Sequence, residues 1–173
     1  ALRLMARQGA DATGMRAVAD ACGVNVAAIY YHFPSKAALL RAVIEERHYE
    51  LLLQIAPVDR HAGSPRTRLR DLMWSMWRGA QREEQVWRLL IAESCHHNED
   101  AREVAAQLLA SVEAAVAEWL GDAVGQLRVP TPVAARIVVD ALLAFLVECA
   151  IRGGEAWESW AASRADDLAA ALV

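Results

Sequence analysis

Residues 16–36 read RAVADACGVNVAAIYYHFPSK, and this stretch decides the fold of the N-terminal part of the chain. The spacing predicts one short helix over Met15–Ala21 and a second over Val26–His32. Between them, Gly23 tolerates the positive φ that a tight turn needs, so the two helices form a helix-turn-helix. The side chains expected to pack these two helices together are Val18, Ala19, Val24 and Ile29.

Helical periodicity continues outward from this motif, and no stretch of four or more residues alternates like a strand. The clearest break is Pro57–Pro65, and the last helix is expected from Trp157 onward. The other expected helices are Ala1–Gln8, one capped by Ser35 and running to about Ile55, Thr67–Arg82, Glu84–His97, one capped by Asn98, and Thr131–Arg152. The fold class is therefore all-α: a three-helix head with a helix-turn-helix at residues 1–48, followed by a helical bundle at residues 49–173.

Composition favours a soluble, cytoplasmic protein. The chain has 173 residues, of which 55% are hydrophobic, so it can bury a core. The longest strictly apolar stretch near the C-terminus, Ala141–Val147, falls far short of the roughly 20 residues that a membrane helix needs. Cys22, Cys95 and Cys149 are an odd, widely spaced set that fits a reducing compartment. Because the chain does not begin with Met, we expect its start to be truncated.

Net charge is −4, but it is unevenly distributed. Residues 1–48 carry six Lys or Arg and four acidic residues, whereas the remaining 125 carry 12 Arg and 18 acidic residues. A basic module on an acidic body makes DNA one possible partner.

The predicted second helix has side chains that suit DNA. Asn25 at its start can cap the helix and face a base edge or a phosphate. Ala27 and Ala28 are small enough to approach the groove closely. Val26 precedes them in the same first turn of the helix. The donors that can reach phosphate oxygens are Tyr30, Tyr31 and His32. An aromatic plug in a helix corner is the other interpretation of these rings.

Lys36 is the only lysine in the sequence, and it lies in the first turn of the next predicted helix. The helix dipole disfavours a cation there. A phosphate bound at that helix N-terminus would explain the placement, since the anion would satisfy both the backbone N–H groups and the lysine.

On these residues the chain resembles the TetR family of bacterial transcriptional regulators. The resemblance covers about the first 45 residues, through Gly9–Thr13, Val18–Val24, Ile29–Lys36 and Leu39. It implies a three-helix DNA-binding head and a larger helical body for ligand binding and dimerisation. It also implies a homodimer on a palindromic operator, usually a repressor, released when a small molecule binds the body.

Carried over by position, the resemblance implies DNA contacts by Arg16, Asn25, Val26, Ala27, Ala28, Tyr30, Tyr31, His32 and Lys36. This sequence departs from the family pattern at four positions, where Cys22 and Ala28 replace the usual alanine and threonine, and Asn25 and Ala37 the usual serine and glutamate. These departures bear on which operator is read rather than on DNA binding itself.

The predicted helix Thr131–Arg152 has a narrow polar line, formed by Arg136, Asp140, Glu148 and Arg152, and is otherwise apolar. Such a helix must be covered on more than one side. We expect a homodimer through the last two helices, residues 131–173, with the centre of a monomeric bundle as the alternative.

Aromatic and methionine side chains in the body favour a small apolar or aromatic effector. The candidate ligand-binding residues are Met73, Met76, Trp77, Trp87, Leu90, Ile91, Ser94, Trp119 and Phe145. Each of them is equally consistent with ordinary core packing.

Cys95, His96 and His97 carry metal-ligating atoms, but adjacent helical residues point about 100° apart and rarely chelate one ion. We therefore expect no metal and no cofactor. A catalytic nucleophile–base pair and a phosphate loop are also absent from the sequence, so an enzyme is not expected. The remaining alternative is a dimeric interaction protein that has lost specific DNA binding.

Overall fold

Helices account for all the regular secondary structure in the described part of the chain. The computed structural model describes residues 1–173 except 2–3, 6–8, 10–11, 54–57, 96–98 and 153–156. Across these residues it contains eight α-helices and no strand, which confirms the all-α prediction. They are α2 (Met15–Cys22), α3 (Val26–His32), α4 (Lys36–Leu53), α5 (Pro65–Arg82), α6 (Glu84–Cys95), α7 (Glu99–Ala123), α8 (Thr131–Arg152) and α9 (Trp157–Leu172).

The chain divides into two compact units. The first joins Ala1–Tyr49 to Glu83–Leu108, and the second joins Glu50–Arg82 to Leu109–Val173. The first unit therefore holds α2, α3 and α6 with parts of α4 and α7. The predicted boundary between functional domains at residues 48 and 49 remains a prediction.

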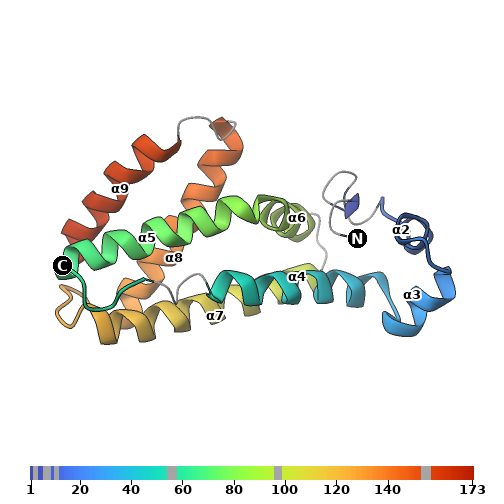
Figure 1. Cartoon of the computed structure of the whole chain (residues 1–173), viewed down its shortest axis with the longest axis horizontal. Coiled ribbons are helices and arrows are strands. Elements are labelled where there is room, and N and C mark those ends of the chain that lie inside the picture. The colour runs from blue at the N-terminus through green and yellow to red at the C-terminus, as the bar shows by residue number, and fades with distance from the viewer. Residues whose placement is uncertain (2–3, 6–8, 10–11, 54–57, 96–98, 153–156) are drawn as a thin grey trace. The chain divides into compact units, whose positions relative to one another are not determined.

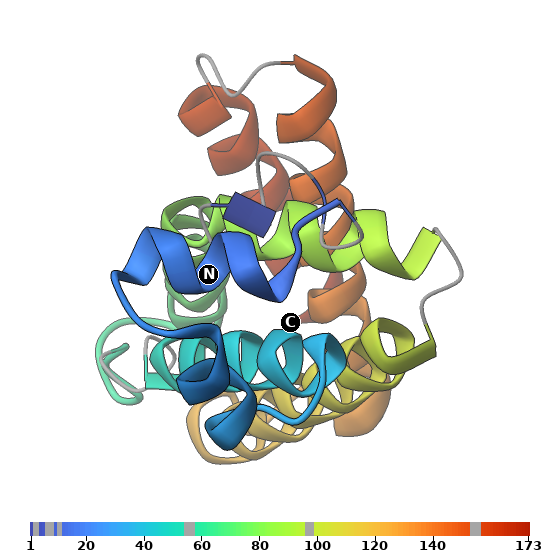
Figure 2. The same cartoon turned by 90° about the vertical axis from the view of Figure 1, so that its right-hand side faces the viewer.

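In the first unit, α2 and α3 pack against each other through the inner side of α2, where Val18 and Ala19 are buried as expected. Figure 2 shows α3 lying below α2. The expectation that Val24 packs between the helices is wrong, because this side chain is 44% exposed. Its N–H donates to the carbonyl of Ala19 at 3.0 Å, so the residue closes the turn with its backbone and leaves the side chain outside.

The N-terminal segment of the first unit is held by buried polar groups. Thr13 is fully buried, and its hydroxyl donates to the carbonyl of Gly9 at 2.8 Å. Gly9 has a φ of 83°, which agrees with the predicted helix end at this residue. On α4, Leu39, Leu40 and Ile44 are buried.

In the second unit, α5 is the central helix and packs against both α8 and α9, with α9 running alongside it (Figure 1). Its buried side chains include Leu69, Leu72, Met73, Met76 and Trp77. α9 approaches α5 through small residues, since Ala161, Ala165 and Ala169 are all fully buried at a spacing of four. A stripe of methyl groups lets two helix backbones come close together.

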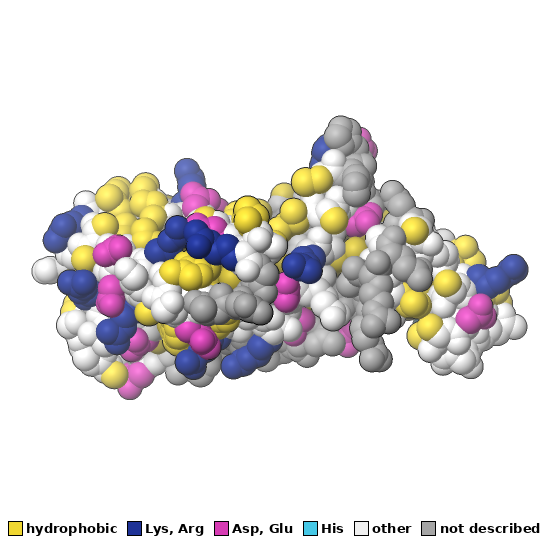
Figure 3. All heavy atoms as spheres, turned by 90° about the horizontal axis from the view of Figure 1, so that it is seen from above, with side chains coloured by type: hydrophobic (Ala, Val, Ile, Leu, Met, Phe, Trp, Pro, Cys, Tyr) yellow, Lys and Arg dark blue, Asp and Glu magenta, His cyan; other side chains and the backbone are white. Residues whose placement is uncertain are grey.

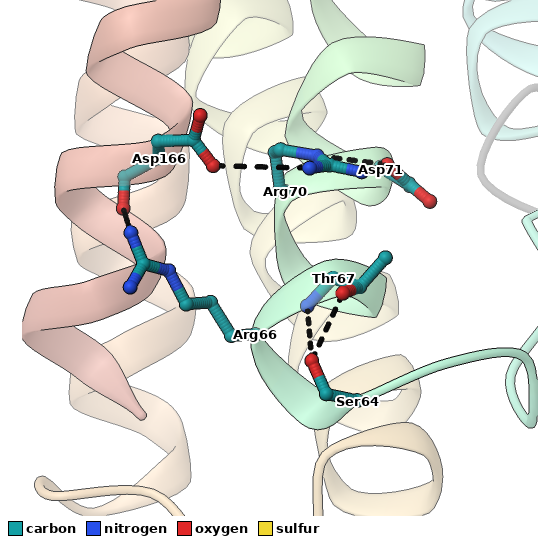
Figure 4. A network of polar contacts seen from close by, with 6 residues as sticks. All are labelled: Ser64, Arg66, Thr67, Arg70, Asp71 and Asp166. Carbon is teal, nitrogen blue, oxygen red and sulfur yellow. Dashed lines mark hydrogen bonds and ion pairs between the residues drawn. The ribbon is translucent and has the colours of Figure 1, made fainter.

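α5 begins at Pro65, two residues before the predicted start. Proline suits the first helical position because its missing N–H would have no partner there. The hydroxyl of Ser64 caps the helix by accepting the N–H of Thr67 at 3.2 Å (Figure 4). One turn further along α5, the guanidinium of Arg70 donates to the carboxylate of Asp71. A guanidinium nitrogen of Arg70 also lies 3.9 Å from a carboxylate oxygen of Asp166, so this ion pair links the start of α5 to α9.

Within the described residues, Ala101–Ala123 of α7 is long and apolar enough to cross a membrane by length and composition alone. The core helix of a soluble protein passes the same test, and α7 carries a buried stripe that includes Val112, Val116 and Leu120. One such helix is weak evidence for a membrane span.

The αL turn at Gly23, with a φ of 69°, provides a test of the fold. In Gly23→Ala we expect the free energy of unfolding to fall by about 1 kcal/mol, because a Cβ disfavours this conformation. Gly121→Ala should instead raise it by about 0.5–1 kcal/mol, since Gly121 lies in α7 and an added Cβ would meet nothing within 4 Å. Urea titrations of both variants, followed by circular dichroism, measure the two changes. Equal shifts of the same sign would contradict the role given to the turn.

Candidate nucleic-acid interface

None of the seven residues of α3 is buried: Val26 and Ile29 are half-buried and the other five are exposed. Tyr31 is 84% exposed and Tyr30 is 51% exposed. Burial of apolar surface normally stabilises a helix, so a short helix that presents large aromatic rings to solvent has surface available for a partner.

The two ends of α3 hold its conformation. Gly23 adopts the αL conformation just before the helix, and its N–H donates to the carbonyl of Asp20 at 3.2 Å. The side chain of Asn25 accepts the N–H of Ala27 at 2.9 Å, which confirms the predicted cap. At the other end, the N–H of Phe33 donates to the carbonyl of Ile29 at 2.8 Å. The helix is thereby fixed while its side chains remain accessible.

The predicted DNA-contacting residues lie on α2, on α3 with its N-cap, and at the start of α4. Most are exposed: Arg16, Asn25, Ala27, Ala28, Tyr30, Tyr31 and His32. Val26 and Lys36 are half-buried. The rings of Tyr31 and His32 meet edge to face, with centroids 5.1 Å apart. These rings do not fill a helix corner, because both belong to exposed residues.

Lys36 is the first residue of α4, as predicted. The hydroxyl of Ser35 accepts the N–H of Ala38 at 3.0 Å, so Ser35 caps this helix. A cation thus lies at the positive end of a helix dipole, next to the exposed face of α3. An anion is the group that such a helix end attracts.

The predicted effector residues are mostly core. Eight of the nine have buried side chains or, for Ser94, a buried hydroxyl: Met73, Met76, Trp77, Trp87, Leu90, Ser94, Trp119 and Phe145. The ninth, Ile91, is 39% exposed. Four of them, Trp87, Leu90, Ile91 and Ser94, belong to the first unit and the other five to the second.

Two of the predicted residues meet in the second unit. Trp77 of α5 and Phe145 of α8 stack nearly parallel, with centroids 5.1 Å apart and an interplanar angle of 7°. Sequence reasoning missed the rings that surround this pair, namely Trp74, Trp157 and Trp160. The spacing of Trp74 and Trp77 by three, and of Trp157 and Trp160 by three, was the available signal, since it puts each pair on one helix face.

Two polar atoms in the predicted set are buried. The indole N–H of Trp119 and the hydroxyl of Ser94 have no hydrogen-bond partner among the described residues. A buried donor without a partner costs about 1–3 kcal/mol. Each of these atoms is therefore suited to bonding a further molecule, such as water or a ligand.

No group of three or more His, Cys, Asp or Glu side chains in the described part of the chain is arranged to hold a metal ion. Cys95 is exposed at the end of α6. His96 and His97 lie outside the described residues.

The N-terminal residues of the chain match a known protein family. Residues 1–43 match the family model for bacterial regulatory proteins of the tetR family. An uncharacterised HTH-type transcriptional regulator of Bacillus subtilis, YuxN, is 33% identical over 70 residues. That match covers 40% of this chain and only 24% of YuxN, so the chain spans about a quarter of this relative's length in the alignment.

Solved structures resemble the chain over nearly its whole length. Salmonella enterica GusR matches with a TM-score of 0.78 at 21% identity, covering 99% of this chain and 90% of GusR. Reduced Escherichia coli NemR matches with a TM-score of 0.78 at 16% identity, covering 96% of this chain and 92% of NemR. A tetR-family regulator from Shewanella sp. PV-4 matches with a TM-score of 0.74 at 20% identity, covering 99% and 93%.

The structural neighbours establish the fold, and the matched N-terminal residues form the helix-turn-helix head of that fold. Over residues 1–43 the chain is therefore similar to the tetR family of bacterial regulatory proteins, and its fold is that of the solved structures.

Proposed function

We propose that this protein is a ligand-responsive repressor that works in the cytoplasm, binds a palindromic operator as a homodimer and leaves it when a small apolar or aromatic effector binds. The observation that carries the proposal is α3, a capped helix with no buried residue and with exposed aromatic rings. A helix of this kind inserts its N-terminal residues into the major groove.

The proposed DNA contacts divide into two sets. Asn25, Val26, Ala27 and Ala28 at the start of α3 face base edges, where a small side chain permits contact with a thymine methyl group. The second set comprises Arg16, Tyr30, Tyr31, His32 and Lys36, which bind phosphates and orient the helix.

The proposed effector response is supported by the aromatic character of the body. Large planar rings with a few polar tips suit a small apolar ligand. Within the second unit, Trp77 and Phe145 stack against each other, which brings two such rings together.

The proposed dimer uses α8 and α9, and its support lies on the outer side of α8. Three large apolar side chains there are exposed, Val133, Val147 and Ile151, the last of them by 78%. They share a face of the helix, because Val147 follows Val133 by fourteen residues and Ile151 follows Val147 by four, and both spacings are close to whole numbers of helical turns. A symmetric dimer formed through such faces contains two copies of α3, the number that the two half-sites of a palindrome require.

The competing function is a dimeric interaction protein that does not bind DNA specifically. It is distinguished by fluorescence anisotropy of the protein on its own upstream DNA at two salt concentrations. A specific repressor binds at two subunits per site, weakens with salt and is poorly displaced by random DNA. Absence of binding even at low salt would favour the interaction protein.

Phosphate contacts can be tested at Lys36 and Tyr30. Lys36→Ala should weaken operator binding and reduce the slope of log K against log salt by about one, because one phosphate contact is lost. Tyr30→Phe, which removes a neutral hydroxyl, should weaken binding with little change in slope. Anisotropy titrations over a range of salt concentrations measure both quantities. Arg82→Ala, an exposed change at the end of α5, is the control and should alter neither.

The cap and the DNA contact of Asn25 can be separated by two substitutions. Asn25→Ala should lower the free energy of unfolding by about 0.5–2 kcal/mol, because the N–H of Ala27 loses its acceptor. Asn25→Asp keeps a capping oxygen and should preserve stability, yet it adds a negative charge beside DNA and should weaken operator binding. Urea titration and anisotropy measure the two effects. Wild-type affinity in Asn25→Asp would remove Asn25 from the interface.

The dimer surface can be tested by charge. Ile151→Asp combined with Val147→Asp should convert the dimer to a monomer of about half its mass at micromolar concentration, because a buried unpaired carboxylate is costly. Sedimentation velocity measures the change. Ala114→Asp, at an exposed position of α7, is the matched control and should leave the association unchanged. A wild-type protein that sediments as a monomer would contradict the proposed dimer.

A further inference from the structure

Glu93 of α6 differs from the other acidic residues whose side chains the structure describes, because it is removed from water. It is 2% exposed, and Thr13 is the other polar residue that is buried in the described part of the chain. On the face drawn in Figure 3, by contrast, acidic and basic side chains lie interleaved at the surface. Burying a carboxyl group is costly unless hydrogen-bond donors surround it, so a buried glutamate indicates a specific set of contacts.

The carboxyl group of Glu93 lies against the N-terminal segment of the first unit. One of its oxygens is 3.9 Å from the position that a Cβ on Gly9 would occupy. Gly9 has a φ of 83°, and its carbonyl accepts the hydroxyl of the buried Thr13 at 2.8 Å. The two buried polar side chains therefore meet at one bend of the backbone, which we call the Gly9 turn and define by Gly9 and Thr13.

The Gly9 turn leads directly into the helix-turn-helix. α2 begins at Met15, two residues after Thr13, and its N-cap, Gly14, provides no side-chain cap. The entry to α2 therefore depends on the buried bonds of the Gly9 turn and not on a capping side chain. Because α2 packs against α3, a shift of the Gly9 turn would be passed on to α3.

The end of α6 that carries Glu93 is also joined to α7, and α7 is joined to α4. The guanidinium of Arg102 donates to the carbonyl of Ser94 at 2.9 Å. Arg41 of α4 lies 3.2 Å from Glu103 of α7, but these side chains are 34% and 58% exposed. Exposed ion pairs contribute little to stability, whereas a bond made out of water is stronger. The buried carboxyl group of Glu93 is therefore the polar contact that can do most to hold the head on α6.

We propose that Glu93 is a positioning residue for DNA binding: its carboxyl group bonds the Gly9 turn, fixes the head on α6 and so sets the direction in which α3 is presented to DNA. This inference rests on the proposed function, and it adds a residue that does not touch DNA to those proposed to contact it. The side chain is required as a hydrogen-bond acceptor, so an apolar side chain of similar size should not replace it.

Hydrogen–deuterium exchange of the full chain without DNA tests the bond to the Gly9 turn. Glu93→Leu keeps a similar volume but supplies no acceptor, so amide exchange across α2 should become about tenfold faster while exchange across α5 stays unchanged. Glu93→Gln keeps an acceptor oxygen at the same reach and should lie closer to the wild type. Glu84→Leu, on the same helix at a side chain that is 44% exposed, is the matched control and should leave exchange across α2 unchanged. An equal increase across α2 and α5 would overturn the bond, since it would show a general loss of stability.

Operator binding tests the positioning role. Fluorescence anisotropy should show that Glu93→Leu binds the operator about tenfold more weakly than the wild type, with most of the loss restored in Glu93→Gln. Binding to a duplex that carries one half-site should change much less, because α3 is unaltered and only the alignment of two heads on two half-sites is lost. A merely structural role would weaken both DNAs equally, and that result would overturn the positioning role.

These measurements separate failure of this inference from failure of the proposed function. If the wild type binds its operator and Glu93→Leu matches it in exchange and in affinity, the role of Glu93 is overturned and the repressor stands. If exchange across α2 rises in Glu93→Leu but the wild type binds no DNA even at low salt, the bond to the Gly9 turn stands, and the repressor is overturned together with the positioning role.

Discussion

The second unit depends on the burial of α5 between α8 and α9. Each large apolar side chain of α5 that leaves water contributes about 1.5–3 kcal/mol, and Trp77 adds its stacking on Phe145. On the other side, the alanine stripe of α9 allows the two helices to approach closely. Close packing at the alanines leaves the larger rings of Trp157 and Trp160 at the other end of α9, where they gather around Phe145. The cluster of aromatic rings around Phe145 thus results from how α9 packs.

In the head, by contrast, α3 is not stabilised by burial of its own side chains. α3 is too short to be stable in isolation and buries none of its residues, so its conformation depends on the turn at Gly23, on the Asn25 cap and on the backbone bond of Phe33. The buried residues that α3 lacks are present in its neighbours: Val18 and Ala19 in α2, and Leu39, Leu40 and Ile44 in α4. The helix proposed to contact DNA is thus supported by its neighbours and by its ends.

Sequence reasoning succeeded where the signal is local. The bounds of α3 and α8 agree with the predicted ones because Asn25, Phe33-Pro34 and Pro132 act within one helical turn of each end. Val24 was placed in the core on its apolar character, yet the turn geometry directs it outward. The start of α5 was missed because a proline-rich break was taken to exclude proline from the first turn.

The body shows where such reasoning stops. Helical spacing tells which face of a helix is apolar, but it does not tell which other helix covers that face. Trp77 and Phe145 were both singled out, but nothing in their spacing could pair α5 with α8, and Trp160 entered only when α9 was folded against them. The bond between Arg164 of α9 and Glu148 of α8 could not be predicted for the same reason, since it joins two helices.

Because no residue of α3 is buried, substitutions along this helix carry little penalty from packing. Under the proposed function, selection can therefore alter the operator without first compensating a loss of stability in the head. The residues that fold the head and those proposed to contact DNA are largely different sets, and that separation would allow copies of one gene to diverge toward new target sites while keeping the same scaffold.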